Sequence, residues 1–173
     1  MTETLKGTCL CGGVEYEVQD PEALGYCHCS RCQRWTGSSL AGVVVAPENF
    51  RFTKGEDLVK RYESELAPRN FCSNCGSSLF DDLGSVYFVA AGLMGDLELT
   101  PSFHQQVAYK ASWHTIGDDA PQFAEMPPGC RQRQCRSSRK PGASGLRRWL
   151  SPLVQLGRLG AGSTDASSHA TAV

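Results

Sequence analysis

The chain has 173 residues and a mass of 18.8 kDa, enough for one domain of ordinary size and some additional length. No stretch approaches the roughly 20 consecutive apolar residues that a membrane-spanning helix needs, so we expect no membrane span. Residues 1–128 contain 17 Asp and Glu against 9 Lys and Arg, a net charge of −8 that argues against nucleic-acid binding by this part.

The first residues also bear on the compartment. Residues 1–7 contain the acidic Glu3 and no apolar run, so they resemble neither a secretory signal nor an Arg-rich transit peptide. We therefore expect a cytoplasmic protein. Because a reducing compartment keeps thiols free, clustered cysteines there more often bind metal than form disulfides. The alternative, a secreted domain stapled by disulfides, is disfavoured because CxC neighbours cannot easily bridge to each other.

Short strands separated by turns are predicted along the first part of the chain. The segments with alternating or β-forming composition are residues 14–18, 40–45, 50–52, 58–62, 85–91, 107–109 and 113–116. One short helix is predicted over residues 30–36, with Ser30 as its N-cap and Gly37 just after its end. This spacing of strands predicts an all-β domain made of short antiparallel strands.

The composition changes near residues 127–129. Residues 129–173 contain 8 Lys and Arg against one acid, a net charge of +7, and are rich in Gly, Ser, Ala, Arg and Gln. We predict a zinc-binding domain over residues 4–129 and a basic, low-complexity, disordered tail over residues 130–173. An amphipathic pattern within 146–159 leaves open a contact with a membrane surface or a partner. Cys130 and Cys135 are interpreted as ordinary free thiols.

The other seven of the nine cysteines form three tight clusters. These are CxC at Cys9 and Cys11, CxCxxC at Cys27, Cys29 and Cys32, and CxxC at Cys72 and Cys75. A structural zinc site is closed by four ligands, whereas a catalytic zinc keeps three protein ligands and one open position. Seven ligands therefore predict two Zn²⁺ ions per chain, one structural and one catalytic.

Spacing suggests how the ligands divide. Cys72 and Cys75 are followed by Gly76, which tolerates the positive φ that a metal-binding knuckle needs. Cys9 and Cys11 are two residues apart near the start of a predicted strand, where alternate side chains point the same way. We predict that these four thiolates hold the structural zinc and close a loop of about sixty residues.

The remaining three cysteines, Cys27, Cys29 and Cys32, predict a compact site with an open face. Water, His28 or a ligand's thiol could fill the open position, and we expect the ring of His28 to point away from the metal. Three thiolates leave a zinc site at a net charge of −1, so it should acidify water less than a zinc held by neutral histidines. A thiol is the natural fourth ligand. The chemistry predicted is the making or breaking of a carbon–sulfur bond in a small thiol adduct.

These clusters resemble a known family. The segments GTCLCGG at 7–13, CHCSRCQR at 27–34, FCSNCG at 71–76 and EMPPG at 125–129, together with residues between 110 and 123, are similar to the glutathione-dependent formaldehyde-activating enzyme and centromere protein V family. The resemblance extends over about residues 4–129. It implies a β-tent fold related to zinc ribbons, with the same division into a structural four-cysteine zinc and a catalytic three-cysteine zinc.

The resemblance also implies an activity. The family's namesake acts on an adduct of glutathione and formaldehyde, and the family belongs to the carbon–sulfur lyase class. We therefore expect a zinc-dependent carbon–sulfur lyase that acts on a glutathione-like thiol adduct. The alternative is a non-catalytic, zinc-organised binding module whose basic tail contacts a polyanion or a protein partner.

Five further residues have interpretations of their own. Arg34 either pairs with a carboxylate of a glutathione-like ligand or is an ordinary surface arginine. Arg69 is interpreted as a solvated surface residue, and His104 as structural rather than as an acid or base. Trp35 and Trp113 are expected in the core rather than against a substrate.

Overall fold

The structure, a computed structural model, describes residues 4–127. Ten strands, one α-helix and four single-turn 3₁₀ helices make up this part of the chain. The strands are β1 (Thr4–Thr8), β2 (Glu15–Gln19), β3 (Ala23–Cys27), β4 (Leu40–Val45), β5 (Phe50–Lys54), β6 (Val59–Tyr62), β7 (Arg69–Cys72), β8 (Ser78–Asp82), β9 (Tyr87–Ala90) and β10 (Pro101–Gln105). The helices are α1 (Ser30–Thr36), η1 (Pro47–Asn49), η2 (Glu56–Leu58), η3 (Ala91–Leu93) and η4 (Val107–Tyr109). The predicted all-β class is confirmed.

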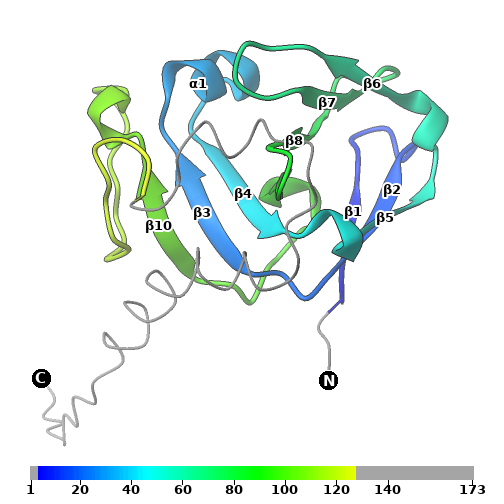
Figure 1. The fold of residues 1–173 in the computed structure, drawn as a ribbon, viewed down its shortest axis with the longest axis horizontal. Helices are drawn as coiled ribbons and strands as arrows, with labels where there is room; N and C mark the ends of the chain where they lie inside the picture. The colour runs from blue at the N-terminus through cyan, green and yellow to red at the C-terminus, as the bar shows by residue number, and fades with distance from the viewer. Residues whose placement is uncertain (1–3, 128–173) are drawn as a thin grey trace, which may run out of the picture.

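The strands form two sheets (Figure 1). The smaller has the order β1-β2-β5, and the larger has the order β10-β3-β4-β9-β8-β7-β6. All neighbouring strands are antiparallel except β10 and β3, whose pairing is parallel. The parallel pair departs from the predicted antiparallel arrangement. It arises because the chain, after β9, crosses residues 91–100 and returns as β10 at the far edge of the sheet.

The core lies on both faces of β4. Val43 and Val45 point into a cluster with residues from β2, β8 and β9, whereas Leu40 and Val44 belong to a second cluster with Phe88 and Phe103. Successive side chains of a strand point to opposite faces, so a strand that is apolar at both parities is buried on both sides. The uninterrupted apolar run of β4 is explained by this position.

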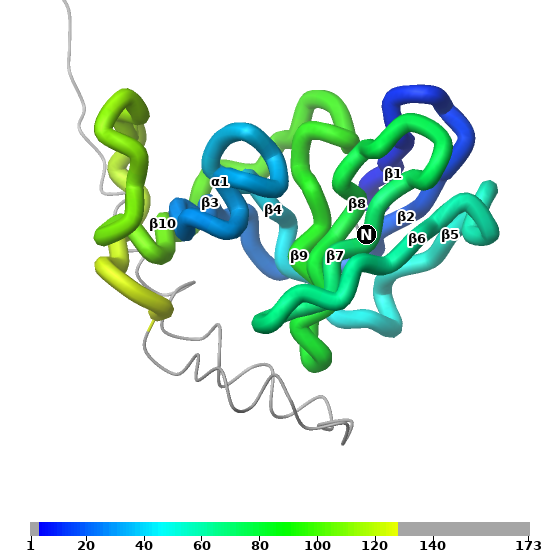
Figure 2. Tube along the Cα trace, turned by 90° about the horizontal axis from the view of Figure 1, so that it is seen from above, coloured from blue at the N-terminus to red at the C-terminus, as the bar shows by residue number. Residues whose placement is uncertain are grey.

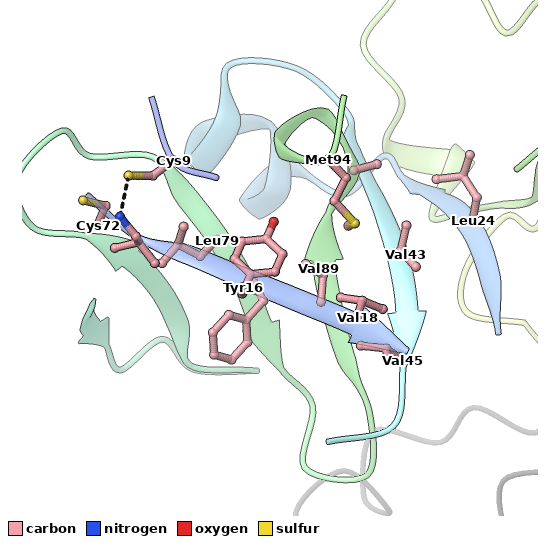
Figure 3. Close-up of a cluster of buried hydrophobic side chains, with 13 residues drawn as sticks. Cys9, Tyr16, Val18, Leu24, Val43, Val45, Cys72, Leu79, Val89 and Met94 are labelled. Carbon is pink, nitrogen blue, oxygen red and sulfur yellow. Dashed lines mark hydrogen bonds between the residues drawn. The ribbon is translucent and has the colours of Figure 1, made fainter. Parts of the chain in front are cut away.

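The two cores contain different cysteines. Cys9 and Cys72 belong to the cluster around Val43, and Figure 3 shows their sulfurs at one end of that cluster. Cys27 and Cys32 belong to the cluster on the other face of the larger sheet, beside α1. The two groups of cysteines are therefore built into separate cores.

Two of the predicted strands are wrong. Residues 107–109 form η4, because Gln106 takes a positive φ of 60° and ends the extended chain of β10. Residues 113–116 contain no strand, since a turn in which the His114 amide donates to the Ala111 carbonyl interrupts them. Figure 2 shows this segment, drawn in yellow-green, beside β10 at the edge of the larger sheet.

The predicted tail over 130–173 lies outside the described residues, so it and the domain boundary at residue 129 stay predictions. Within residues 4–127, no helix has the length and apolarity required to cross a bilayer.

Candidate functional site

Four cysteines from distant parts of the chain meet at one point. The sulfur atoms of Cys9, Cys11, Cys72 and Cys75 all lie within 4.8 Å of one another. Cys11 Sγ lies 3.5 Å from Cys9 Sγ and 3.9 Å from Cys72 Sγ, and all four are free thiols. A tetrahedron of thiolates around zinc, with Zn–S bonds of about 2.3 Å, has S–S edges of about 3.8 Å. The four-thiol cluster therefore has the dimensions of a closed zinc site.

The prediction placed Cys9 and Cys11 near the start of a strand, where alternate side chains point the same way. In the structure they do not lie on a strand. They lie in the turn between β1 and β2, where Gly12 has a φ of 68° and its amide donates to the Cys9 carbonyl at 2.9 Å. The Val14 amide donates to Cys9 Sγ at 3.2 Å. The sulfurs converge because the chain turns around them, so the prediction of their partnership rested on the wrong local geometry.

Cys72 and Cys75 form the expected tight turn. Gly76 has a φ of 78°, and its amide donates to the Cys72 carbonyl at 2.8 Å. The side chain of Asn74 donates to Cys11 Sγ at 3.2 Å, so this turn also contacts the sulfur of the other one. Cys9 and Cys72 are buried and Cys11 is exposed, which places the cluster at the surface end of the core.

The three-thiol cluster is formed by residues close together in sequence. Cys27 ends β3, Cys29 is the N-cap of α1, and Cys32 lies in the first turn of that helix; their sulfurs are also within 4.8 Å of one another. The N-cap is therefore Cys29 and not Ser30, because Cys29 Sγ accepts the Cys32 amide at 3.4 Å. Gly37 closes the helix with a φ of 81°, as predicted.

The three thiols differ in acidity. Hydrogen bonds donated by Cys27 and Cys32 lower the pKa of the Cys29 thiol, and the bond with Cys29 is the main cause of the raised pKa of Cys27. Cys29 is also the least buried of the three.

A cavity of about 670 Å³ opens beside this cluster. Its volume is within the range of roughly 300–1,000 Å³ that is usual for small-molecule sites. Its lining consists of all three cysteines together with Ser30, Arg31, Arg34, Leu66, Ala67, Arg69, Asp81, Leu83, Phe88, Gln105, Gln106, Tyr109 and Met126. A second cavity of about 470 Å³ shares Arg31, Arg34 and Arg69 with it. Arg31 and Arg34 of α1 and Arg69 of β7 therefore border both cavities.

Arg69 corrects the prediction of a solvated surface arginine. It is only 6% exposed, and its guanidinium forms a buried ion pair with Asp81, which lies directly opposite it on β8. Both Nη atoms also donate to Cys32 Sγ at 3.7 Å. Burial raises the pKa of Asp81 to about 6, although Arg69 acts in the opposite direction. A positive charge is therefore in direct contact with the three-thiol cluster.

His28 does not belong to the three-thiol cluster, in agreement with the expected direction of its ring. Its Nε2 lies 2.9 Å from Nδ1 of His104, and Nε2 of His104 lies 3.0 Å from the carboxylate of Asp118. Both histidines are almost fully buried. Asp118 accepts the Nε2 proton of His104, which leaves Nδ1 of His104 to accept from His28. Burial, reinforced by the neighbouring His104, lowers the pKa of His28 to about 4, so its ring is neutral near pH 7.

The remaining predicted residues have mixed outcomes. Arg34 is exposed and, unlike Arg31, is in no ion pair within residues 4–127. Trp35 is half-buried and packs edge-on against Phe71, whereas Trp113 is 67% exposed and is not a core residue. The turn at 111–114 holds Trp113 away from the core.

Sequence reasoning missed Asp81 and Asp118. Neither is near a cysteine in sequence, and the contact of each depends on strand pairing. The one available signal for Asp81 was its place directly after the apolar Leu79 and Phe80, where a buried charge needs a partner.

Comparison with known proteins identifies the family of this chain. Residues 4–110 match the family described as glutathione-dependent formaldehyde-activating enzyme. The chain belongs to this family. All seven clustered cysteines lie within the matched residues, as do Arg34, Arg69, Asp81 and His104. Asp118 lies beyond them, so the family resemblance of residues 111–129 stays an expectation.

Individual relatives of the formaldehyde-activating enzyme family are distant. An uncharacterized lyase of Schizosaccharomyces pombe is 29% identical over 98 residues, which cover 54% of this chain and 70% of the relative. A Halomonas elongata protein, provisionally named a glutathione-dependent formaldehyde-activating enzyme, is 27% identical over 126 residues, covering 65% of this chain and 80% of the relative. A crystal structure of a Rhodobacter sphaeroides protein is 26% identical, with a TM-score of 0.47 over 54% of this chain and 91% of that one.

Proposed function

We propose that this protein is a zinc-dependent carbon–sulfur lyase that acts on a glutathione-like thiol adduct. The observation that carries the proposal is the position of the three-thiol cluster in the wall of a 670 Å³ cavity. A cluster that serves only to hold the fold needs no adjoining space. Three converging sulfurs beside a cavity match a metal site that keeps one position for a ligand.

The proposal includes two zinc ions with different roles. Cys9, Cys11, Cys72 and Cys75 would hold the structural ion, and Cys27, Cys29 and Cys32 would hold the catalytic one. An ion bound by the three thiolates supplies a Lewis-acid position that takes a further thiol as thiolate. Among the protein's own groups, the Arg69 guanidinium offsets part of the thiolate charge through its contact with Cys32.

The two arginines of α1 would bind the rest of a glutathione-like ligand. Arg34 borders both cavities and has no ion-pair partner in the described chain, so its guanidinium is free to bind a carboxylate. Arg31 borders the same space but is paired with Glu65. Arg34 is therefore the better candidate for the carboxylate of the thiol adduct, which favours the first of the two interpretations left open by the sequence.

Cobalt substitution tests this function. Co²⁺ in thiolate sites has charge-transfer bands that change when another sulfur binds. We expect titration with glutathione to perturb these bands in the wild-type protein and not in Cys29→Ser, in which the three-thiol cluster is broken. S-methylglutathione serves as the control ligand, because its sulfur is methylated and it has no ionisable thiol. If glutathione leaves the wild-type spectrum unchanged, the proposed function is wrong.

A further inference from the structure

The cavity beside the three-thiol cluster has an apolar side that the proposed function does not use. The apolar residues of its lining come from three separate segments and are Leu66, Ala67, Leu83, Phe88, Tyr109 and Met126. The first two lie between β6 and β7, the next two in the β8–β9 turn and on β9, and the last two in η4 and near residue 127. Segments that are far apart in the chain therefore contribute apolar side chains to one cavity wall.

Two of these side chains are exposed. Within residues 4–127, the large apolar side chains that are exposed are Leu10, Tyr62, Leu66, Tyr109 and Trp113. Leu66 is 44% exposed and Tyr109 is 56% exposed, and both line this cavity. Single exposed apolar residues are common on protein surfaces, but two that line the same cavity as the buried Phe88 indicate a ligand with an apolar part.

The apolar side of the cavity adjoins the sulfur atoms. Leu83 and Phe88 belong to the same cluster of hydrophobic side chains as Cys27, Cys29 and Cys32. In a ligand whose sulfur approaches the three-thiol cluster, the group attached to that sulfur would therefore lie against this wall.

The polar side of the cavity is formed by a different element. Apart from its cysteines, α1 contributes only Ser30, Arg31 and Arg34 to the lining, and none of the six apolar residues lies on this helix. A glutathione-like adduct has its carboxylates on one part of the molecule and the substituent of its sulfur on another. The division of the cavity into a basic side and an apolar side matches this division of the ligand.

We propose that the apolar side of the cavity binds the substituent on the sulfur of the thiol adduct, and that this substituent is a large apolar group, such as an alkyl chain of several carbons or an aromatic ring. This inference rests on the proposed function and narrows its substrate class. A one-carbon substituent is too small to contact side chains from three segments of the chain. Leu66 and Tyr109 are the specificity-determining residues, because the substituent would cover their exposed surface.

The test measures the affinity of the zinc-loaded full chain for S-methylglutathione and S-hexylglutathione by isothermal titration calorimetry. The two probes have the same carboxylates and differ only in the length of the alkyl group on sulfur. Each methylene group that is buried against an apolar wall strengthens binding by up to about fourfold. We expect S-hexylglutathione to bind at least about 30-fold more tightly than S-methylglutathione.

Two variants locate the gain in affinity. Leu66→Ser combined with Tyr109→Ser removes both exposed apolar side chains from the cavity, and we expect the ratio of the two affinities to fall below about fivefold. Leu10→Ser is the matched control, because Leu10 is 85% exposed and lies between two cysteines of the four-thiol cluster. The control should keep the wild-type ratio. Since all three side chains are exposed, both variants should fold, which circular dichroism checks.

The outcomes separate this inference from the proposed function. The inference is wrong if wild type binds both probes equally, if the double variant keeps the wild-type ratio, or if Leu10→Ser loses as much of it. The proposed function then stands or falls by the cobalt titration alone. If glutathione leaves the cobalt spectrum unchanged, the proposed function fails, and the inference that depends on it fails too. A high ratio in wild type and Leu10→Ser that is lost in the double variant supports the apolar subsite.

Discussion

At the scale of single residues, Arg69 changes the charge balance of the candidate active site. Three thiolates around a divalent ion carry a net charge of −1, and a guanidinium in contact with one sulfur offsets it. Asp81 on the other side of the guanidinium restores a negative charge close to the cavity. The site thus contains a row of alternating charges, with the sulfurs at one end and the Asp81 carboxylate at the other.

The buried pair of Arg69 and Asp81 gives a stability prediction. We expect Arg69→Met to lower the free energy of unfolding by about 3–5 kcal/mol near pH 8, because it leaves the Asp81 charge buried without a partner. The loss should be smaller at acidic pH, since a protonated Asp81 needs no neighbouring cation. Urea unfolding at several pH values measures both effects.

The control for this prediction is Arg61→Ala. Arg61 forms exposed ion pairs with Glu63 and Asp82, and pairs of this kind contribute about 0–1 kcal/mol. If Arg69→Met lowers the free energy of unfolding by no more than Arg61→Ala does, the buried Arg69–Asp81 pair does not contribute to stability as predicted. The ion pair itself could not be read from the sequence, because it depends on the β7–β8 register.

At the scale of elements, the loop between β3 and α1 is fixed by a row of hydrogen bonds. This row runs from His28 in the loop to His104 on β10 and on to Asp118. The amide of His28 also donates to the Gln105 carbonyl at 3.0 Å, and Gln33 Nε2 donates to the His28 carbonyl at 2.7 Å. β10 and α1 therefore fix the residue between two of the three thiols. We expect these hydrogen bonds to affect the positions of the three sulfurs and therefore the affinity of the cluster for a metal ion.

Substituting His104 by Phe tests the role of this row. Phe fills a similar volume but leaves Nε2 of buried His28 without a partner. We expect Co²⁺ affinity at the three-thiol cluster to fall about tenfold, by analogy with outer-sphere partners of metal ligands. The four-thiol cluster is the internal control, and its affinity should not change. His114→Phe is the matched variant, since its ring lies 5.2 Å from His28 but forms no hydrogen bond with it. Equal losses in both variants would contradict this role.

The elements also show what the sequence could predict. The bounds of α1 are those expected, because Gly37 stops the helix, and β4 is correct because its apolar run is unbroken. β7 and β8 contain polar residues such as Arg69, Asn70 and Asp81 at buried positions, so their composition does not indicate strands. The parallel β10–β3 pair is a long-range property that no local pattern reports. The grouping of the cysteines was predictable from their CxC, CxCxxC and CxxC spacing, whereas the turn that brings Cys9 and Cys11 to the four-thiol cluster was not.

At the scale of the whole molecule, the two cysteine clusters should differ in what their loss does. The four-thiol cluster joins residues 9 and 11 to residues 72 and 75 and is continuous with the larger core. The three-thiol cluster lies within six consecutive residues and closes no long loop. We therefore expect metal binding at the first cluster to stabilise the long-range fold, and binding at the second to organise one loop and one helix.

Zinc content and unfolding of two serine variants test this difference. We expect two zinc ions per wild-type chain by elemental analysis. Cys29→Ser should lose one ion and remain folded by circular dichroism, because its cluster is local. Cys72→Ser should lose the other and unfold, since it opens a loop of about sixty residues. The opposite pattern would show that the structural and catalytic roles are exchanged.

Because a thiol caps α1, the ligand binding proposed for this helix would depend on the metal at the three-thiol cluster. A helix of seven residues is too short to persist without tertiary support, and its first turn depends on Cys29 and Cys32. Arg31 and Arg34 lie on that same helix. We therefore expect chelation to loosen the first turn of the helix as well as to remove the ion, and so to disturb the guanidinium groups proposed to bind an anionic ligand. We expect the metal-free protein to bind its ligand weakly as well as to be inactive.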